Sequence, residues 1–181
     1  MGGVLLNKNE LRKFFLSKVS EISKERQEKA SQTLYLKLLE VSKNHSLIAS
    51  FASVGSEINT WKFNLEMIKQ QKLALPRVSG KNLIFYKVFS IEDLERSNFG
   101  ILEPKIMGPP LAIDVINLFI VPGVAFDKNN QRLGKGRGFY DYFISLHGIK
   151  NTLGVGYKEQ LSNSPLPLEL HDKALKDVLF F

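Results

Sequence analysis

The sequence predicts an α/β domain in which helices pack on a largely parallel β-sheet. Short apolar runs alternate along the chain with longer stretches whose apolar residues recur every three or four positions, and this alternation is typical of parallel sheets with crossover helices. The chain has 181 residues, of which 44% are hydrophobic, which is enough for the core of one domain. Because no internal repeat, low-complexity tract or linker divides the chain, we expect a single domain over residues 1–181.

The first third of the chain predicts two helices and a strand. Asn7 and Glu10 have the spacing of a capping box, and two amphipathic stretches and a buried strand follow. The first stretch carries Leu11, Phe14, Phe15, Val19 and Ile22, the second carries Ala30, Leu34, Leu38 and Val41 and runs to Asn44, and the strand is expected at residues 47–52.

The middle of the chain predicts one further helix and three strands. These elements are a helix capped by Thr60 and carrying Leu65 and Ile68, strands at 73–75 and 83–86 around a turn at Gly80, a short helical turn at 90–93, a turn-rich segment at 104–110, and a strand at 115–121 that ends at Pro122 and Gly123.

The last third predicts a helix and two closing strands. The helix begins near Tyr140, carries Phe143, Ile144 and Leu146, and ends at Gly148, and the strands are expected at 153–156 and 178–181. In such a sheet, ligands bind at the loops that follow the carboxyl ends of the strands.

Composition narrows the possible functions. The chain has no cysteine, which excludes disulfides, thiolate metal sites and a cysteine nucleophile, and we expect a cytoplasmic protein. No apolar run is long enough to span a membrane or to form a signal segment. The net charge of +7 indicates anionic partners, which include nucleic acid, nucleotides and polycarboxylate metabolites. The three histidines do not have metal-ligand spacing.

The segment Leu133-Gly134-Lys135-Gly136-Arg137-Gly138-Phe139-Tyr140-Asp141 carries the strongest functional signal. Glycines let successive backbone N–H groups converge on an anion, and the start of the next helix adds partial positive charge. Lys135 and Arg137 supply two cations, so the loop suits a polyphosphate. Its spacing matches neither the Walker pattern nor the dinucleotide fingerprint, and a solvated basic turn is the alternative.

Several charged residues could extend this site. Asp141 could hold Mg²⁺ or only complement the helix dipole, and Asp172 could be a second magnesium ligand or a turn residue. Lys8 and Arg12 share a helix face, which could be functional or simply solvated. Glu57 follows a predicted strand, where ligand-contacting acids and ordinary loop charges both occur.

A long stretch of the chain resembles the 5-formyltetrahydrofolate cyclo-ligase family. The resemblance covers residues 119–127 and 132–141, and it continues in Lys8-Asn9-Glu10-Leu11-Arg12, Glu57-Ile58-Asn59-Thr60, Pro76-Arg77 and His171-Asp172, in the family's order. It implies a three-layer α/β fold with Rossmann-like topology. It also implies conversion of 5-formyltetrahydrofolate and ATP into 5,10-methenyltetrahydrofolate, ADP and phosphate, with Mg²⁺.

The resemblance also implies roles for individual residues. ATP would be bound by Lys8, Arg12, Arg132, Leu133, Gly134, Lys135, Gly136, Arg137, Gly138, Phe139 and Tyr140; the folate by Ala52, Glu57, Lys135, Gly136, Arg137, Gly138 and Phe139; and magnesium by Asp141 and Asp172. Lys135 and Arg137 would be the catalytic residues, because they would stabilise charge on the transferring phosphoryl group. The family more often has tyrosine at the position of Phe139 and an acid at that of Lys176.

Two other classes of function stay open from the residues alone. The basic glycine loop with Phe139 and Tyr140 nearby would suit a small RNA-binding module, although the basic residues are dispersed. A sugar-phosphate isomerase could be built on a related scaffold, since a fold does not fix the chemistry. The cyclo-ligase interpretation instead predicts a monomer that binds ATP and 5-formyltetrahydrofolate, with or without a polyglutamate tail, and neither nucleic acid nor membrane.

Overall fold

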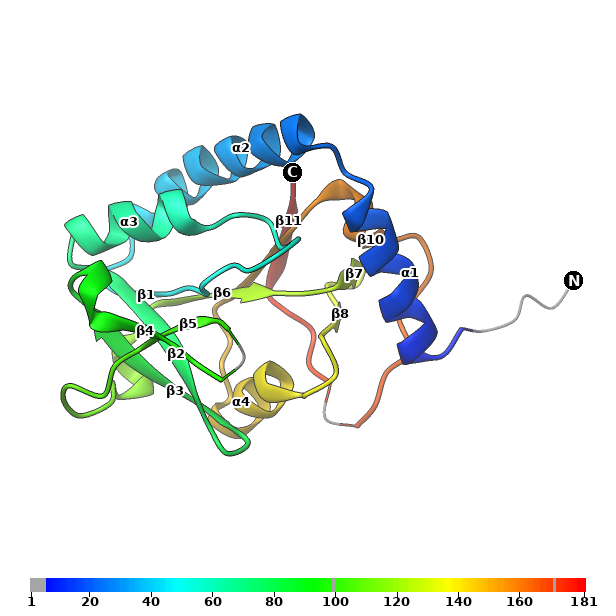
Figure 1. Ribbon diagram of the computed structural model, residues 1–181. Coiled ribbons are helices and arrows are strands. Elements are labelled where there is room, and N and C mark those ends of the chain that lie inside the picture. The colour runs from blue at the N-terminus through cyan, green and yellow to red at the C-terminus, as the bar shows by residue number, and fades with distance from the viewer. Residues whose placement is uncertain (1–5, 99, 171) are drawn as a thin grey trace, which may run out of the picture.

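A six-stranded, largely parallel sheet forms the centre of the protein (Figure 1). The computed structural model describes residues 6–98, 100–170 and 172–181. The strand order is β11-β9-β6-β1-β2-β3, and only β3 runs antiparallel to its neighbour. The strands are β1 (Ile48–Ala49), β2 (Leu73–Ser79), β3 (Asn82–Val88), β6 (Leu118–Pro122), β9 (Thr152–Gly156) and β11 (Asp177–Phe180). The α/β prediction is confirmed.

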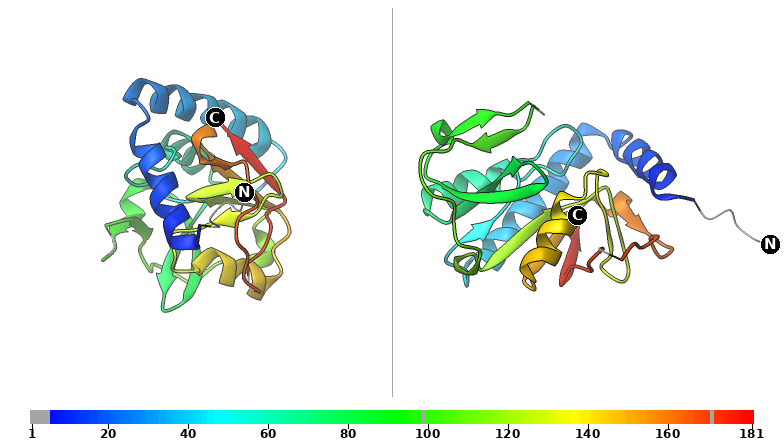
Figure 2. Two further views of the ribbon diagram at one scale, coloured as in Figure 1. Left: turned by 90° about the vertical axis from the view of Figure 1, so that its right-hand side faces the viewer. Right: turned by 90° about the horizontal axis from the view of Figure 1, so that it is seen from below.

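Helices cover both faces of this sheet and give three layers. Helices α2 (Lys24–Ser42) and α3 (Trp61–Lys69) lie on one face, and α4 (Phe139–His147) lies on the other (Figures 1 and 2). The position of β6 between two cores explains why its sequence is continuously apolar. Leu118 and Ile120 enter the core beneath α2 and α3, while Phe119 and Val121 enter the core beneath α4, so neither set of alternate side chains faces water.

The order in which strands are added to the sheet reverses between β1 and β6. From β1 it passes through α3 to β2 on one side, and from β6 it passes through α4 to β9 on the other. The loops that follow β1 and β6 therefore separate over opposite faces of the sheet and leave a crevice at their carboxyl ends, which is where open α/β sheets bind ligands.

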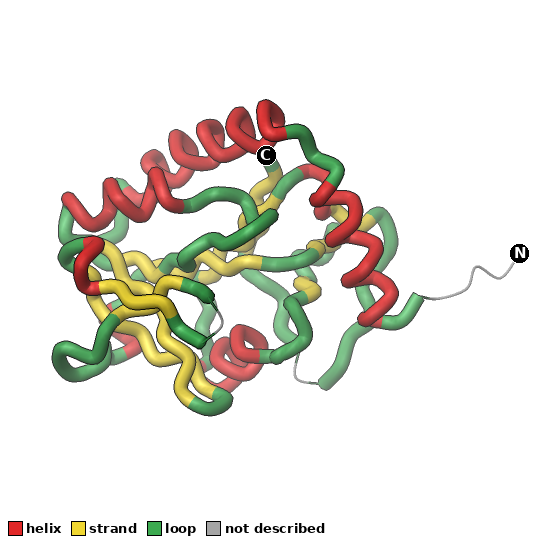
Figure 3. The backbone as a smooth tube through the Cα atoms, in the orientation of Figure 1, coloured by secondary structure: helices red, strands yellow, loops and turns green. Residues whose placement is uncertain are grey.

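A small second sheet with a helix packed on it, a short hairpin and several 3-10 helices lie around the central sheet (Figure 3). Helix α1 (Lys8–Ser20) packs Phe15 against Ala125 and Leu133 of a small sheet made of β7 (Ala125–Asp127), β8 (Arg132–Leu133) and β10 (Leu161–Ser162). A hairpin of β4 (Leu94–Arg96) and β5 (Leu102–Pro104) lies beside β2, and short 3-10 helices occur at Ile91–Asp93, Ile113–Val115 and Lys158–Gln160. None of the helices in the described part of the chain is long and apolar enough to cross a membrane.

The predicted local signals are largely confirmed. Asn7 and Glu10 form the expected capping box, with Asn7 Oδ1 accepting from the Glu10 amide at 3.1 Å and Glu10 Oε2 accepting from the Asn7 amide at 2.8 Å. The turn at Gly80 joins β2 to β3, and Gly148 ends α4. The strand predicted at 47–52 is shorter than expected, because only Ile48–Ala49 pairs with neighbouring strands.

Some local predictions are wrong. Residues 115–117 do not belong to β6, since a 3-10 helix that ends at Val115 and two residues of irregular backbone precede the strand. Thr60 stands at the start of α3 but does not cap it, because its hydroxyl donates instead to the Phe51 carbonyl at 2.8 Å. Three apolar helix residues that were predicted to face the core lie instead on the solvent-exposed sides of their helices; these are Phe14, Leu65 and Leu146.

Candidate active site

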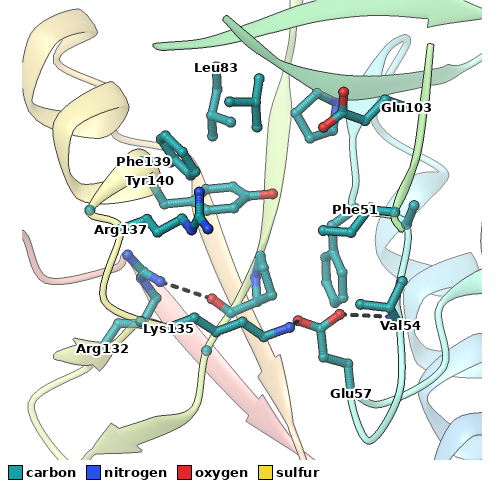
Figure 4. Close-up of a pocket in the computed structure, with 18 of the residues that line it drawn as sticks. Phe51, Val54, Glu57, Leu83, Glu103, Arg132, Lys135, Arg137, Phe139 and Tyr140 are labelled. Carbon is teal, nitrogen blue, oxygen red and sulfur yellow. Dashed lines mark hydrogen bonds and ion pairs between the residues drawn. The ribbon is translucent and has the colours of Figure 1, made fainter. Parts of the chain in front are cut away.

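A cavity of about 390 Å³ opens at the crevice between the loops after β1 and β6 (Figure 4). Phe51, Ala52 and Glu57 come from the first loop, and Pro122 and Gly123 come from the end of β6. The volume lies within the range of small-molecule sites, and most of the walls are apolar with a few charged groups, as such sites require. The expectation that ligand-binding loops gather beyond the strand ends is therefore met by the geometry.

The glycine loop lies between β8 and α4 and forms one wall of this cavity. Gly138 starts α4 with a φ of 69°, a left-handed conformation that glycine adopts without strain, and no side chain caps the helix there. Lys135, Arg137, Phe139 and Tyr140 all line the cavity (Figure 4). The loop thus brings two cations and the start of a helix to the same wall.

An ion pair joins this loop to the opposite side of the cavity. Lys135 Nζ lies 2.7 Å from Glu57 Oε1, while Glu57 Oε2 accepts a hydrogen bond from the Val54 amide at 2.9 Å (Figure 4). The Glu57 side chain is 16% exposed and that of Lys135 is 53% exposed. Lys135 therefore has room to move to another anion, whereas Glu57 is held in place by its own backbone turn.

A buried ion pair supports the loop from beneath. Arg132 Nη2 lies 2.6 Å from Asp141 Oδ2, and Arg132 Nη1 donates to the Pro122 carbonyl at 3.2 Å. The guanidinium also lies 5.6 Å from the centre of the Tyr140 ring, a favourable cation–π distance. These contacts connect β6, β8 and α4 directly below the cavity.

Tyr140 directs its hydroxyl into the cavity (Figure 4). Burial, reinforced by the Glu57 carboxylate, raises the pKa of Tyr140 far above its ordinary value, although the charge of Arg132 partly opposes this effect. The hydroxyl therefore remains protonated across the physiological range and can donate a hydrogen bond to a ligand.

Helix α1 carries the two predicted cations, of which Arg12 contacts the glycine loop and Lys8 contacts the segment around Asp172. Arg12 Nε donates to the Gly134 carbonyl at 2.8 Å, and Lys8 Nζ lies 2.6 Å from Asp172 Oδ2 and 3.2 Å from Glu169 Oε1. Gly136 lies next to Arg12 as well. Leu133 belongs instead to the core under α1, so it contacts no cavity through its side chain. His171 of the predicted His171-Asp172 motif lies outside the described residues.

The two acids predicted to bind magnesium each face a cation. Asp141 Oδ2 pairs with Arg132, but Asp141 Oδ1 is buried and has no hydrogen-bond partner. Asp172 Oδ2 accepts from Lys8 and from the Glu169 amide at 2.7 Å. Among the described residues no cluster of three or more histidines and acids could hold a metal alone. Mg²⁺ bound with ATP needs only one or two carboxylates besides phosphate oxygens and water, so the unpaired oxygen of Asp141 fits that requirement.

Other cavity residues were not predicted as site residues from the sequence. They are Phe51, Val54, Pro76, Val78, Leu83, Ile101, Leu102, Glu103, Pro122 and Gly123. Most are apolar, and apolar residues in or beside strands are equally typical of core. Glu103 belongs to the β4–β5 hairpin, which the sequence did not predict, so no local pattern connects it with the glycine loop.

The match to a known family agrees with this geometry. A model of the 5-formyltetrahydrofolate cyclo-ligase family matches residues 5–180. The chain belongs to this family. Among similar proteins are the 5-formyltetrahydrofolate cyclo-ligase of Haemophilus influenzae, 32% identical with 73% of this chain and 74% of the relative covered, and that of Mus musculus, 26% identical with 76% and 74% covered.

Solved structures of cyclo-ligase relatives have the same fold. The 5,10-methenyltetrahydrofolate synthetase of Aquifex aeolicus superposes with a TM-score of 0.82 at 32% identity, covering 94% of this chain and 88% of that one. The 5,10-methenyltetrahydrofolate synthetase of Mycoplasma pneumoniae superposes with a TM-score of 0.75 at 22% identity, covering 96% and 98%. The resemblance read from the sequence motifs is therefore confirmed, and so is the three-layer α/β fold.

Proposed function

We propose that this cyclo-ligase family member converts 5-formyltetrahydrofolate and ATP into 5,10-methenyltetrahydrofolate, ADP and phosphate, with Mg²⁺ required. The observation that carries the proposal is that the crevice cavity combines the cationic glycine loop with an apolar wall and two acids. Phosphates need the cationic glycine loop, and a folate ring system suits the apolar wall. Family membership favours this chemistry over RNA binding or sugar-phosphate isomerisation.

The reaction needs an activated formyl oxygen, because the oxygen of a formamide is a poor leaving group. The formyl oxygen attacks the γ-phosphoryl group of ATP, and ADP leaves. The resulting N5-iminium phosphate is attacked at the formyl carbon by N10, which loses its proton. The carbon–oxygen bond then breaks as phosphate departs, and the methenyl bridge remains.

Lys135 and Arg137 would stabilise the transferring phosphoryl group. Both line the cavity from the glycine loop, and phosphoryl transfer depends mainly on positioning and charge stabilisation. Tyr140 would donate a hydrogen bond from its protonated hydroxyl. Glu57, which the loop after β1 fixes in place, would accept from the folate, whose ring would lie near Ala52.

The remaining predicted ligands would bind the rest of ATP and the metal. Arg12 contacts the glycine loop, and Lys8 pairs with Asp172 one helical turn away; both would reach phosphates that extend past Gly136. Asp141 and Asp172 would hold Mg²⁺, with the unpaired oxygen of Asp141 as the first ligand. When bound, the metal would neutralise charge on the phosphates.

Absorbance at the methenyltetrahydrofolate band tests the proposal directly. The band should grow when 5-formyltetrahydrofolate is mixed with protein and Mg-ATP, and it should not grow when ATP is omitted. Arg137→Ala should lower kcat by about 10²–10³-fold, the range found when one charge-stabilising donor is removed. Lys128→Ala, which removes an exposed lysine in the turn between β7 and β8, serves as the matched control and should retain full activity.

A folded protein that binds fresh substrate without producing the band would contradict the proposed reaction. Turnover without nucleotide would instead favour an isomerase. RNA binding that weakens steeply with salt, in a protein without ATP turnover, would favour the RNA-binding alternative.

A further inference from the structure

Glu103 is a buried acid in the wall of the cavity. It lies on β5 and is only 5% exposed, yet it lines the cavity together with Phe51 and Leu83. Figure 4 shows it across the cavity from Arg137 and Tyr140. Its position is fixed by the hairpin, because Arg77 on β2 donates to the Pro104 carbonyl at 2.7 Å and holds the end of β5 against the central sheet.

Arg77, the cation whose charge acts on Glu103, is already engaged by other groups. Arg77 Nη1 lies 2.6 Å from Glu95 Oε1 as well as close to the Pro104 carbonyl, and no ion pair within the described residues includes Glu103. Burial raises the pKa of Glu103 above its ordinary value, while the Val78 amide and the charge of Arg77 lower it and Glu95 raises it. This carboxyl group has therefore lost hydration without gaining a full counter-charge.

Glu57, the second acid of the cavity, already has a counter-charge. Glu57 has a lysine partner at 2.7 Å and a backbone donor at 2.9 Å. A ligand donor that reaches Glu103 would meet an acceptor with unused capacity, whereas at Glu57 it would compete with Lys135. Hydrogen bonds to a charged acceptor contribute more than those between neutral groups.

The negative charge of Glu103 also limits which part of a substrate can lie beside it. A carboxylate repels phosphates, which belong on the opposite wall with Lys135 and Arg137. The folate carries a reduced pterin ring with amino and ring N–H donors on its edge and apolar faces that suit contact with Phe51 and Leu83. The polarity of the cavity thus directs the N–H edge of this ring to the side of Glu103.

We propose that Glu103 is a specificity-determining residue that accepts a hydrogen bond from an N–H donor on the pterin ring of the folate. This inference rests on the proposed function, since it requires a folate in the cavity. It adds a substrate contact on β5 to those of the glycine loop and of the loop after β1.

Binding measurements without turnover test this contact. The dissociation constant of 5-formyltetrahydrofolate is measured by calorimetry without ATP, and that of ATP is measured separately. Glu103→Ala should weaken folate binding by about tenfold or more and leave ATP binding unchanged. Glu103→Gln keeps the shape and one acceptor oxygen, so it should weaken folate binding less, by about threefold or more.

Two comparisons separate recognition from a structural role. Glu28→Gln changes an exposed acid of α2 that does not line the cavity, and it should leave both dissociation constants unchanged. The fragment 5-formyltetrahydropterin, which lacks the aminobenzoylglutamate tail, should lose affinity by the same factor as the whole folate when Glu103 is replaced.

Three results would overturn the assignment. Folate affinity within twofold of the wild type in folded Glu103→Ala, or in Glu103→Gln if the alanine variant does not fold, would remove the contact. An effect on the whole folate but not on the fragment would place the contact on the tail. A wild-type protein that does not bind 5-formyltetrahydrofolate would instead refute the proposed function, and the inference with it.

Discussion

Replacing Asp141 with asparagine should destabilise the fold strongly, because it leaves the charge of Arg132 buried without its partner. The two side chains are only 9% and 4% exposed and meet at 2.6 Å. Removing one member of a buried ion pair costs about 3–5 kcal/mol. For a domain of this size each kcal/mol lowers Tm by about 2–4 °C, so we expect Tm to fall by roughly 6–20 °C. Urea unfolding without ATP or Mg²⁺ measures the effect through the midpoint and the m-value.

Two controls make this result specific to the ion pair. Asp114→Asn changes an exposed acid in the same way and should alter stability by less than about 0.5 kcal/mol. The double replacement of Arg132 by methionine and Asp141 by leucine should recover much of the loss, because apolar pairs often replace buried ion pairs without penalty. An Asp141→Asn variant within about 1 kcal/mol of the wild type, at an unchanged m-value, would refute the reasoning.

Three further changes test other parts of the structure. Glu57→Gln should weaken 5-formyltetrahydrofolate binding by about tenfold with ATP binding retained, and an unchanged folate dissociation constant would count against its proposed role. Gly123→Ala should destabilise the protein by about 1–3 kcal/mol in urea unfolding, because its new Cβ would lie 2.5 Å from the buried Phe126 ring; a neutral result would mean that the ring moves easily. Burial raises the pKa of Glu103, so its ionisation opposes folding as pH rises through and above the ordinary carboxyl pKa. Glu103→Gln should therefore have the higher Tm at pH 7, with a difference that shrinks towards pH 3.5, and a pH-independent difference would exclude this cause.

The sequence predicted those parts of the fold that depend on local patterns. The capping box at Asn7, the turn at Gly80 and the end of α4 at Gly148 each follow from a few neighbouring residues, and the structure has all three. The errors occur where distant contacts decide. The Thr60 hydroxyl donates to the Phe51 carbonyl of a distant segment and not to its own helix, and Phe51 and Ala52 do not extend β1 because the chain leaves the sheet there to line the cavity.

From the residue pattern, the candidate site was recognisable mainly where one segment carries its residues, whereas Ala52 and Glu57, which also line the cavity, were singled out by the family resemblance. The glycine loop is continuous in the chain, so its charges and small residues are recognisable together, and the structure does place Lys135, Arg137, Phe139 and Tyr140 around one cavity. Glu103 on β5 and Phe51 in the loop after β1 reach the same cavity from distant parts of the chain, and a single sequence does not report which segments are neighbours. The partners of the predicted cations were missed for the same reason, since Asp172 is 164 residues from Lys8.

These ion pairs constrain how the two substrates would bind on the proposed function. Three cations predicted to hold phosphate are already paired with acids, namely Lys8, Arg132 and Lys135. Arg132 is too buried to change partner without disturbing the sheet, whereas Lys135 is half exposed and can turn to a phosphate. When it does so, Glu57 loses its cation but keeps its backbone donor, and a carboxylate in that position gains most from a new hydrogen-bond donor. On the proposed function the folate would supply this donor, so ATP on the phosphate wall would prepare the opposite wall for the second substrate.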